Sequence, residues 1–142
     1  MKVKRIDHLV LTVQDIDRAA HWYHRVFGMD TVVMQNGHKA LEFGTEGARQ
    51  RIHLQHASHE VEPHAKHPSL GGAEICLVAN VPMTQLLAEL LRDGVDLATE
   101  GIVRREGAQG PTESVYVRDP DGNLIELADY PNDLPNEAFE RY

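Results

Sequence analysis

The clearest structural signal in the chain is the stretch Arg118-Asp119-Pro120-Asp121-Gly122-Asn123-Leu124-Ile125-Glu126-Leu127-Ala128. Asp121-Gly122, placed after Pro120, predicts a hairpin turn. The apolar residues on both sides of the turn predict strands at 114–118 and 124–128. Glu126 lies inside the second strand, where a carboxylate is costly to bury unless it is paired, protonated or bound to a metal. The alternative is a solvated glutamate on an edge strand.

The residues before this hairpin predict a strand, a helix and a further strand. Residues 74–79 read as a strand, and Pro82 lies near the start of the helix, where its missing N–H costs little. Gly94 ends that helix, and another strand signal spans 97–104. The inward helix face should consist of Leu86, Leu87, Leu90 and Leu91.

The first half of the chain shows the same order of elements. Residues 6–13 read as a strand, Asp15 can cap the following helix, and Gly28 ends it. Apolar residues between Ile16 and Phe27 follow one face of a 3.6-residue period. Asn36-Gly37 predicts a hairpin turn, because both residues tolerate positive φ. The strands of this half are expected at 31–34, 40–43 and 51–55.

The two halves align without gaps across their first elements. His8 matches Glu74, Gly28 matches Gly94 and Asp30 matches Asp96, each at an offset of 66 residues. A glycine after a helix is common, but the shared order of strand, helix and three strands favours a duplication. We therefore predict an α+β chain with two tandem βαβββ modules. The predicted parts are a first module at 1–56, a connector at 57–72, a second module at 73–130 and a C-terminal tail at 131–142.

Composition narrows the possible functions. The 142 residues carry a formal net charge of -8, which disfavours binding to nucleic acids or anionic membranes. The single cysteine, Cys76, excludes an internal disulfide and fits a cytoplasmic location. We expect Cys76 to be buried in a strand, with a reactive thiol as the less favoured alternative. No signal peptide or membrane-spanning stretch is evident.

Nine histidines are present, and strand position decides which of them could bind a metal. Because side chains alternate between the faces of a strand, ligands must share the inward parity. If the halves are related by a pseudo-twofold axis, four such positions on the first and last strands of each half converge on one cleft. They are His8, His53, Glu74 and Glu126.

Each candidate ligand has an alternative reading. His8 could be a hydrogen-bonded core histidine, Glu74 could be exposed at a strand start, and His56 rivals His53. The loop residues His59, His64 and His67 are expected to be solvated. Imidazole and carboxylate ligands suit divalent Zn, Ni, Co, Mn or Fe.

Three stretches of the chain resemble the vicinal-oxygen-chelate superfamily of glyoxalases, bleomycin-resistance proteins and extradiol dioxygenases. They are Asp7–Val13, the helix exit Phe27-Gly28 and, most specifically, Arg118–Leu127. The sequences Arg51–His56, Glu62–Lys66 and Glu74–Leu77 are most similar to those of small glyoxalase domain-containing proteins. The resemblance implies paired βαβββ modules that form an incomplete barrel around a divalent metal.

The resemblance also implies ligand positions. His8 and Glu126 match the first-strand and last-strand ligands of the family. The fifth-strand ligand is usually His and is Glu74 here, whereas the fourth-strand ligand, usually Glu or Gln, is His53 here. This exchange disfavours a ring-cleaving dioxygenase, because those enzymes use a fifth-strand His.

The resulting functional hypothesis is a metal-dependent lyase or isomerase of glyoxalase I type. A small substrate with adjacent oxygens, such as a glutathione hemithioacetal, would react through an enediolate, with Glu74 or Glu126 as the base. The alternatives are a drug-binding or metabolite-binding protein without turnover and an extradiol-type dioxygenase. Open sheet edges favour a homodimer, and residues 131–142 are expected to form a short helix or an arm on the partner.

Overall fold

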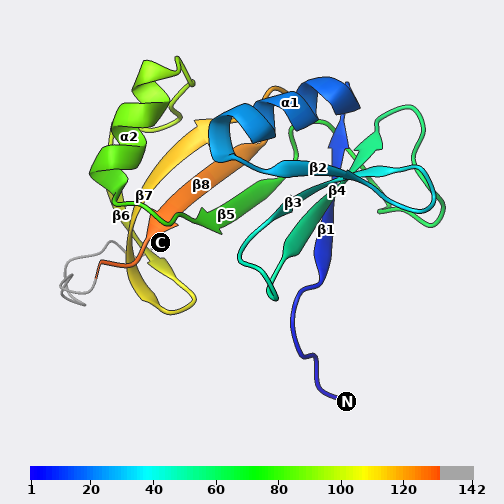
Figure 1. Cartoon of the computed structure of the whole chain (residues 1–142), viewed down its shortest axis with the longest axis horizontal. Coiled ribbons are helices and arrows are strands. Elements are labelled where there is room, and N and C mark those ends of the chain that lie inside the picture. The colour runs from blue at the N-terminus through cyan, green and yellow to red at the C-terminus, as the bar shows by residue number, and fades with distance from the viewer. Residues whose placement is uncertain (132–142) are drawn as a thin grey trace. The chain divides into compact units, whose positions relative to one another are not determined.

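The computed structural model describes residues 1–131 (Figure 1). Its contacts divide the chain into two compact units, unit 1 at Met1–Ala73 and unit 2 from Glu74 onward. Each unit contains one helix and one four-stranded mixed sheet, so the predicted α+β fold is confirmed. Apart from Pro131, the predicted tail lies outside the described residues. No helix within 1–131 is long and apolar enough to span a membrane.

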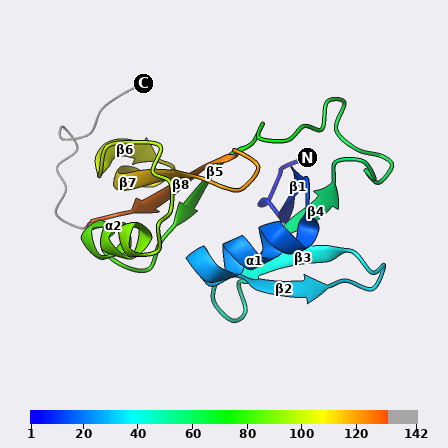
Figure 2. The same cartoon turned by 90° about the horizontal axis from the view of Figure 1, so that it is seen from above.

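Unit 1 has the strand order β1-β4-β3-β2. The β1 and β4 strands are parallel, and the other two pairs are antiparallel. Figure 2 shows α1 running alongside these strands. The elements are β1 (His8–Val13), α1 (Ile16–Phe27), β2 (Asp30–Val33), β3 (Lys39–Phe43) and β4 (Gln50–His56).

The α1 helix has the ends that the sequence predicts. The Asp15 carboxylate accepts a hydrogen bond from the Arg18 backbone N–H at 3.0 Å, which satisfies one of the free donors of the first turn. Gly28 ends the helix with φ +70°, a conformation that costs glycine little. The buried face of α1 packs on β2, β3 and β4 and consists of Ala19, Ala20 and Tyr23.

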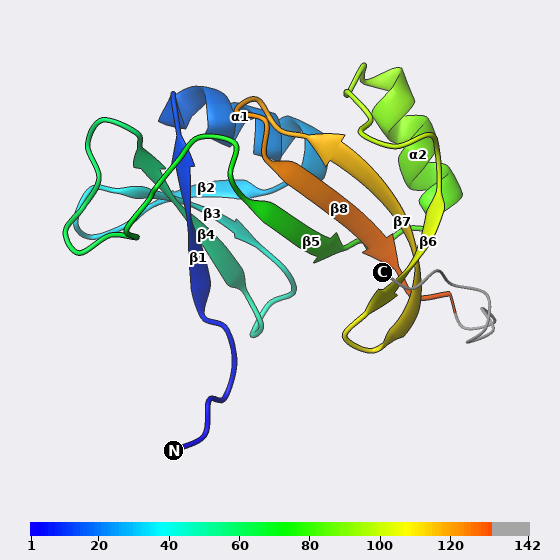
Figure 3. The same ribbon diagram turned by 180° about the vertical axis from the view of Figure 1, so that it is seen from behind.

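Unit 2 has the equivalent order β5-β8-β7-β6. The β5 and β8 strands are parallel, and the other pairs are antiparallel, as Figure 3 shows for the neighbours β5, β8 and β7. The α2 helix packs on β7. The elements are β5 (Glu74–Val78), α2 (Met83–Arg92), β6 (Val103–Gly107), β7 (Gly110–Arg118) and β8 (Leu124–Asp129).

The turn between β7 and β8 is organised by Asp119. Its buried carboxylate accepts hydrogen bonds from the backbone N–H groups of Asp121 and Asn123 and from the Asn123 amide, at 2.8–2.9 Å. Gly122 has φ +90°, and its N–H donates to the Asp119 carbonyl. The predicted turn is therefore present, and it fixes the start of the strand that carries Glu126.

Two local predictions were wrong. Leu91 is 60% exposed, because the inward stripe of α2 starts at Met83 and continues through Leu86 and Leu90. The strand expected at 97–104 is β6 at Val103–Gly107 instead, because Gly101 has φ +69° and interrupts an extended backbone. The hairpin turn predicted at Asn36-Gly37 is present between β2 and β3: Gly37 has φ +85°, and its N–H donates to the Met34 carbonyl at 2.8 Å.

Candidate functional site

The two candidate histidines of unit 1 lie side by side on neighbouring strands. His53 of β4 is paired in register with Val10 of β1, two residues after His8. The His8 and His53 rings stack with their centroids 3.8 Å apart and their planes 10° apart. The structure therefore brings these two predicted ligands together on one face of the parallel strand pair.

Each imidazole is in a state that suits metal binding. The Nδ1 atom of His8 lies 2.8 Å from the Asp7 carboxylate, which leaves Nε2 available. This hydrogen bond lowers the pKa of Asp7. The pKa of His53 is lowered by its partial burial first, and then by the charges of His8 and Arg51. A lowered pKa favours the neutral imidazole, which is the form that binds a metal.

His56, the alternative candidate for the fourth-strand ligand, lies on the opposite face of β4 from His53 and has other hydrogen-bond partners. It is paired with Val13 at the far end of β4 and is three residues from His53, so it has the opposite strand parity. Its Nδ1 accepts the Ser58 backbone N–H at 3.0 Å and lies 3.3 Å from Nδ1 of His59. Within unit 1, His53 is therefore the better candidate for a ligand that acts with His8.

In unit 2, Glu126 has a defined hydrogen-bonding environment. Its Oε2 atom accepts a hydrogen bond from the Ser114 hydroxyl at 2.8 Å, and its Oε1 atom accepts one from the Tyr116 hydroxyl at 3.0 Å. Ser114 is fully buried, and its hydroxyl lies 3.0 Å from that of Thr112. Sequence reasoning missed these hydroxyls, although their spacing along one strand places all three on one face.

Glu74 and Cys76 lie on β5, beside the strand of Glu126. Cys76 is paired in register with Glu126, and Glu74 is paired with Leu124. Cys76 is exposed, so the expected burial was wrong. Partial desolvation of the thiol first, and then the charge of the Glu126 carboxylate and a hydrogen bond to it, raise the pKa of Cys76 to about 11. The thiol is therefore protonated at neutral pH, which disfavours the reactive-thiol alternative.

The histidine pair and the glutamate pair occupy equivalent positions in their own sheets. His53 lies opposite Val10, and Glu126 lies opposite Cys76, in two parallel strand pairs. His8 and Glu74 are each two residues before those partners. Within residues 1–131, no three His, Cys, Asp or Glu side chains are gathered into a group that could hold a metal ion.

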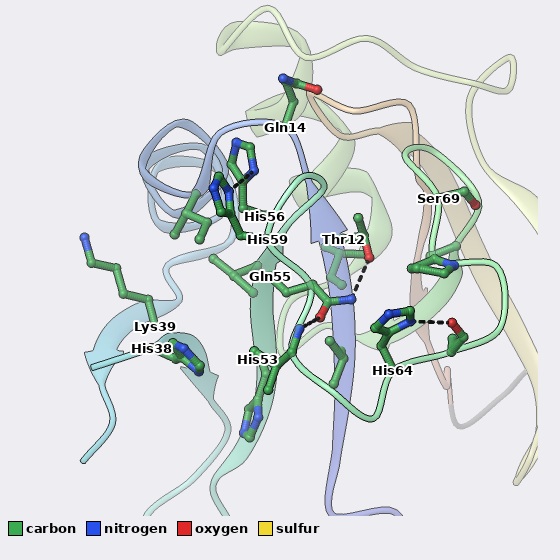
Figure 4. A pocket seen from close by; sticks show the side chains of 18 of the residues that line it. Thr12, Gln14, His38, Lys39, His53, Gln55, His56, His59, His64 and Ser69 are labelled. Carbon is green, nitrogen blue, oxygen red and sulfur yellow. Dashed lines mark hydrogen bonds between the residues drawn. The ribbon is translucent and has the colours of Figure 1, made fainter. Parts of the chain in front are cut away.

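Unit 1 also contains a cavity of about 1140 Å³ that sequence reasoning did not predict (Figure 4). It forms because the residues after β4 fold back toward β1. Gln55 anchors this segment: its amide nitrogen donates to the Thr12 hydroxyl at 3.1 Å, and its amide oxygen accepts the Val61 N–H at 3.5 Å. The histidines that line the cavity are His38, His53, His56, His59, His64 and His67.

Comparison with known proteins gives strong similarity over nearly the whole chain. A virulence protein of Salmonella typhimurium (strain LT2) is 42% identical over 130 residues, which cover 92% of this chain and 87% of that protein. Its crystal structure has a TM-score of 0.86 and covers 92% of this chain and 100% of that one. A glyoxalase domain-containing protein of Mycosarcoma maydis is also 42% identical, over 92% of this chain and 70% of that protein.

More distant similarity reaches proteins with different named activities. A metallothiol transferase of Shouchella clausii is 28% identical over 88% of this chain and 80% of that protein. A biphenyl-2,3-diol 1,2-dioxygenase of Rhodococcus globerulus is 29% identical over 92% of this chain and 65% of that protein. The crystal structure of lactoylglutathione lyase from Agrobacterium tumefaciens shares the fold, with a TM-score of 0.65, 22% identity and coverage of 91% and 96%.

The family model of the Glyoxalase/Bleomycin resistance protein/Dioxygenase superfamily matches residues 5–127. This range includes all four candidate ligands and both sheets except the last two residues of β8, and it confirms the family that the sequence motifs indicate. The chain belongs to the glyoxalase/bleomycin resistance protein/dioxygenase superfamily.

Proposed function

We propose that the protein is a metal-dependent lyase or isomerase of glyoxalase I type that acts on a small substrate with adjacent oxygen atoms. The observation that carries this proposal is the matched placement of two side-chain pairs, His8 with His53 and Glu74 with Glu126. Two imidazoles and two carboxylates form a ligand set that suits a divalent transition metal.

Two features of the histidine surroundings support a metal. The Asp7 carboxylate is placed to hold the His8 ring, as outer carboxylates commonly do for ligating histidines. His53 favours its neutral form. A bound Zn, Ni, Co, Mn or Fe ion would supply Lewis acidity toward the two substrate oxygens.

The two glutamates differ in a way that assigns their roles. Both oxygens of Glu126 are held by hydroxyl groups, so its carboxylate has a fixed orientation suited to a ligand. Glu74 is exposed, and its carboxylate makes no hydrogen bond to a described residue. A carboxylate that can reorient is the better proton carrier, and we propose that Glu74 moves a proton between neighbouring substrate carbons.

The cavity of unit 1 offers room for a small substrate beside His53. No Phe, Tyr or Trp is among its lining residues, within the described part of the chain. A protein that sequesters a flat drug by stacking would need such side chains, so this cavity favours a polar substrate over that alternative. Glu74 at the fifth-strand position also departs from the ligand set of ring-cleaving dioxygenases.

The activity test uses the hemithioacetal of methylglyoxal and glutathione. We expect no turnover after exhaustive chelation and recovery of turnover when one of the five candidate metals is added back. Glu74→Gln should lower kcat by about 100-fold or more, because general base catalysis contributes that much. Glu46→Gln, at an exposed turn position, is the matched control and should leave kcat unchanged. Full activity in the chelated protein would remove the metal from the mechanism.

A further inference from the structure

We propose that Ser114 and Tyr116 form a hydroxyl clamp that positions the Glu126 carboxylate for metal binding. This inference rests on the proposed function, because it assigns a task to residues around one proposed ligand. The clamp is defined by two contacts, Ser114 Oγ to Oε2 at 2.8 Å and Tyr116 Oη to Oε1 at 3.0 Å. It acts through Glu126, so both hydroxyl-bearing residues are positioning residues.

Each oxygen of the Glu126 carboxylate accepts one hydroxyl hydrogen bond in the clamp, and the carboxylate can still bind a further partner. An ionised carboxylate offers about four lone-pair positions on its two oxygens. The two hydroxyl donors and the Cys76 thiol, which also hydrogen-bonds Glu126, use three of these positions, and one remains for a metal or a substrate. Because the two hydroxyl donors come from different places along β7, they fix both the tilt of the carboxylate plane and its rotation about the last side-chain bond.

The clamp is part of a rigid strand. Tyr116 is paired directly with Glu126 across the antiparallel β7–β8 ladder, and Ser114 is paired with Ala128. Ser114 and Thr112 are 0% and 1% exposed, and their hydroxyls are 3.0 Å apart. The Arg105 guanidinium lies 5.8 Å from the centre of the Tyr116 ring. The hydroxyls are therefore held in place before any ligand binds.

The clamp selects one of the two glutamates. Glu126 is only partly exposed and receives both hydroxyls, whereas Glu74 on the neighbouring strand is exposed and receives none from the described residues. A generally polar surface would solvate both carboxylates alike. The asymmetry is what a ligand and a mobile proton carrier require. In unit 1 the Asp7 carboxylate holds the His8 ring in the same way that the clamp holds Glu126.

The test measures Co²⁺ binding by full-length protein through the visible absorption spectrum of the bound ion. Ser114→Ala and Tyr116→Phe should each weaken Co²⁺ affinity by about 10-fold to 100-fold and shift the spectrum, as loss of an outer-shell partner does. Thr112→Val, which removes only the contact to Ser114, should have a smaller effect. Tyr130→Phe is the matched control, because its hydroxyl accepts the Gln109 N–H and does not contact Glu126.

Co²⁺ binding by Glu126→Gln protein distinguishes this inference from the proposed function. In Glu126→Gln protein, Tyr116→Phe should cause no further loss of Co²⁺ affinity, because the clamp has no carboxylate to position. Wild-type affinity and spectrum in the Ser114→Ala/Tyr116→Phe double variant, with weakened binding in Glu126→Gln, would overturn the clamp alone. Unchanged Co²⁺ binding in Glu126→Gln would overturn the ligand role of Glu126 and the clamp together.

Discussion

At the scale of single residues, strand parity separates the candidate ligands from the other histidines. His53 stacks on His8 because both side chains leave their parallel strands on the same face. His56, three residues later, faces a different set of partners. The sequence could narrow the fourth-strand ligand to these two histidines, but only the register of β4 against β1 distinguishes them.

His64 provides a prediction that is independent of metal binding. Its Nδ1–H donates to the Ala65 carbonyl at 2.8 Å, and its Nε2 lies 3.0 Å from the Glu62 carboxylate. The carbonyl first, and then the acidic neighbours, raise the pKa of His64 above its ordinary value of 6.5. We expect an NMR titration midpoint above that value, and a lower midpoint in Glu62→Gln.

The sign of the pH effect follows from the raised pKa. Because folding favours the protonated ring, His64 stabilises the fold at pH values below its unfolded pKa. This contribution is lost as the pH rises through the folded pKa. A midpoint at or below 6.5 in the wild-type protein would contradict the hydrogen bonds described for this ring.

At the scale of elements, helix caps and apolar spacing carry most of the predictable information. Asp15 should stabilise α1, because its carboxylate satisfies a backbone donor of the first turn. We expect Asp15→Ala to lower the free energy of unfolding by about 1 kcal/mol in urea denaturation. Asp17→Ala, which removes a surface ion pair with Lys39 at 2.7 Å, should lower the free energy of unfolding by roughly a few tenths of that amount. Equal losses would contradict the capping role.

The elements that sequence reasoning misplaced depend on backbone geometry or distant contacts. Gly101 interrupts the expected strand at 97–104 by taking a positive φ, which composition alone does not reveal. The cavity of unit 1 arises from long-range anchoring of the segment after β4 by Gln55. By contrast, the α1 cap, Gly28 and the Asp119 turn depend on neighbours within a few residues, and these were predicted correctly.

At the scale of the whole molecule, the repeated sheet order explains why the two candidate ligand pairs occupy equivalent positions. The orders β1-β4-β3-β2 and β5-β8-β7-β6 place the first and last strands of each repeat side by side. Each strand position of the first sheet therefore has a structural counterpart in the second sheet. Val10, which is paired with His53, corresponds to Cys76, which is paired with Glu126. That all four side chains bind one ion, and that the protein is a homodimer, are our proposals.

The most direct test of the central proposal is the metal content and affinity of the wild type, His8→Ala, Glu126→Ala and the double variant. We expect one divalent ion per chain in the wild type and loss of tight binding in each single variant, although the two residues belong to different units. The loss of affinity in the double variant should be smaller than the sum of the two single losses, because both residues would bind the same ion. Full, tight occupancy in either single variant, or independent and additive losses, would contradict one shared metal site.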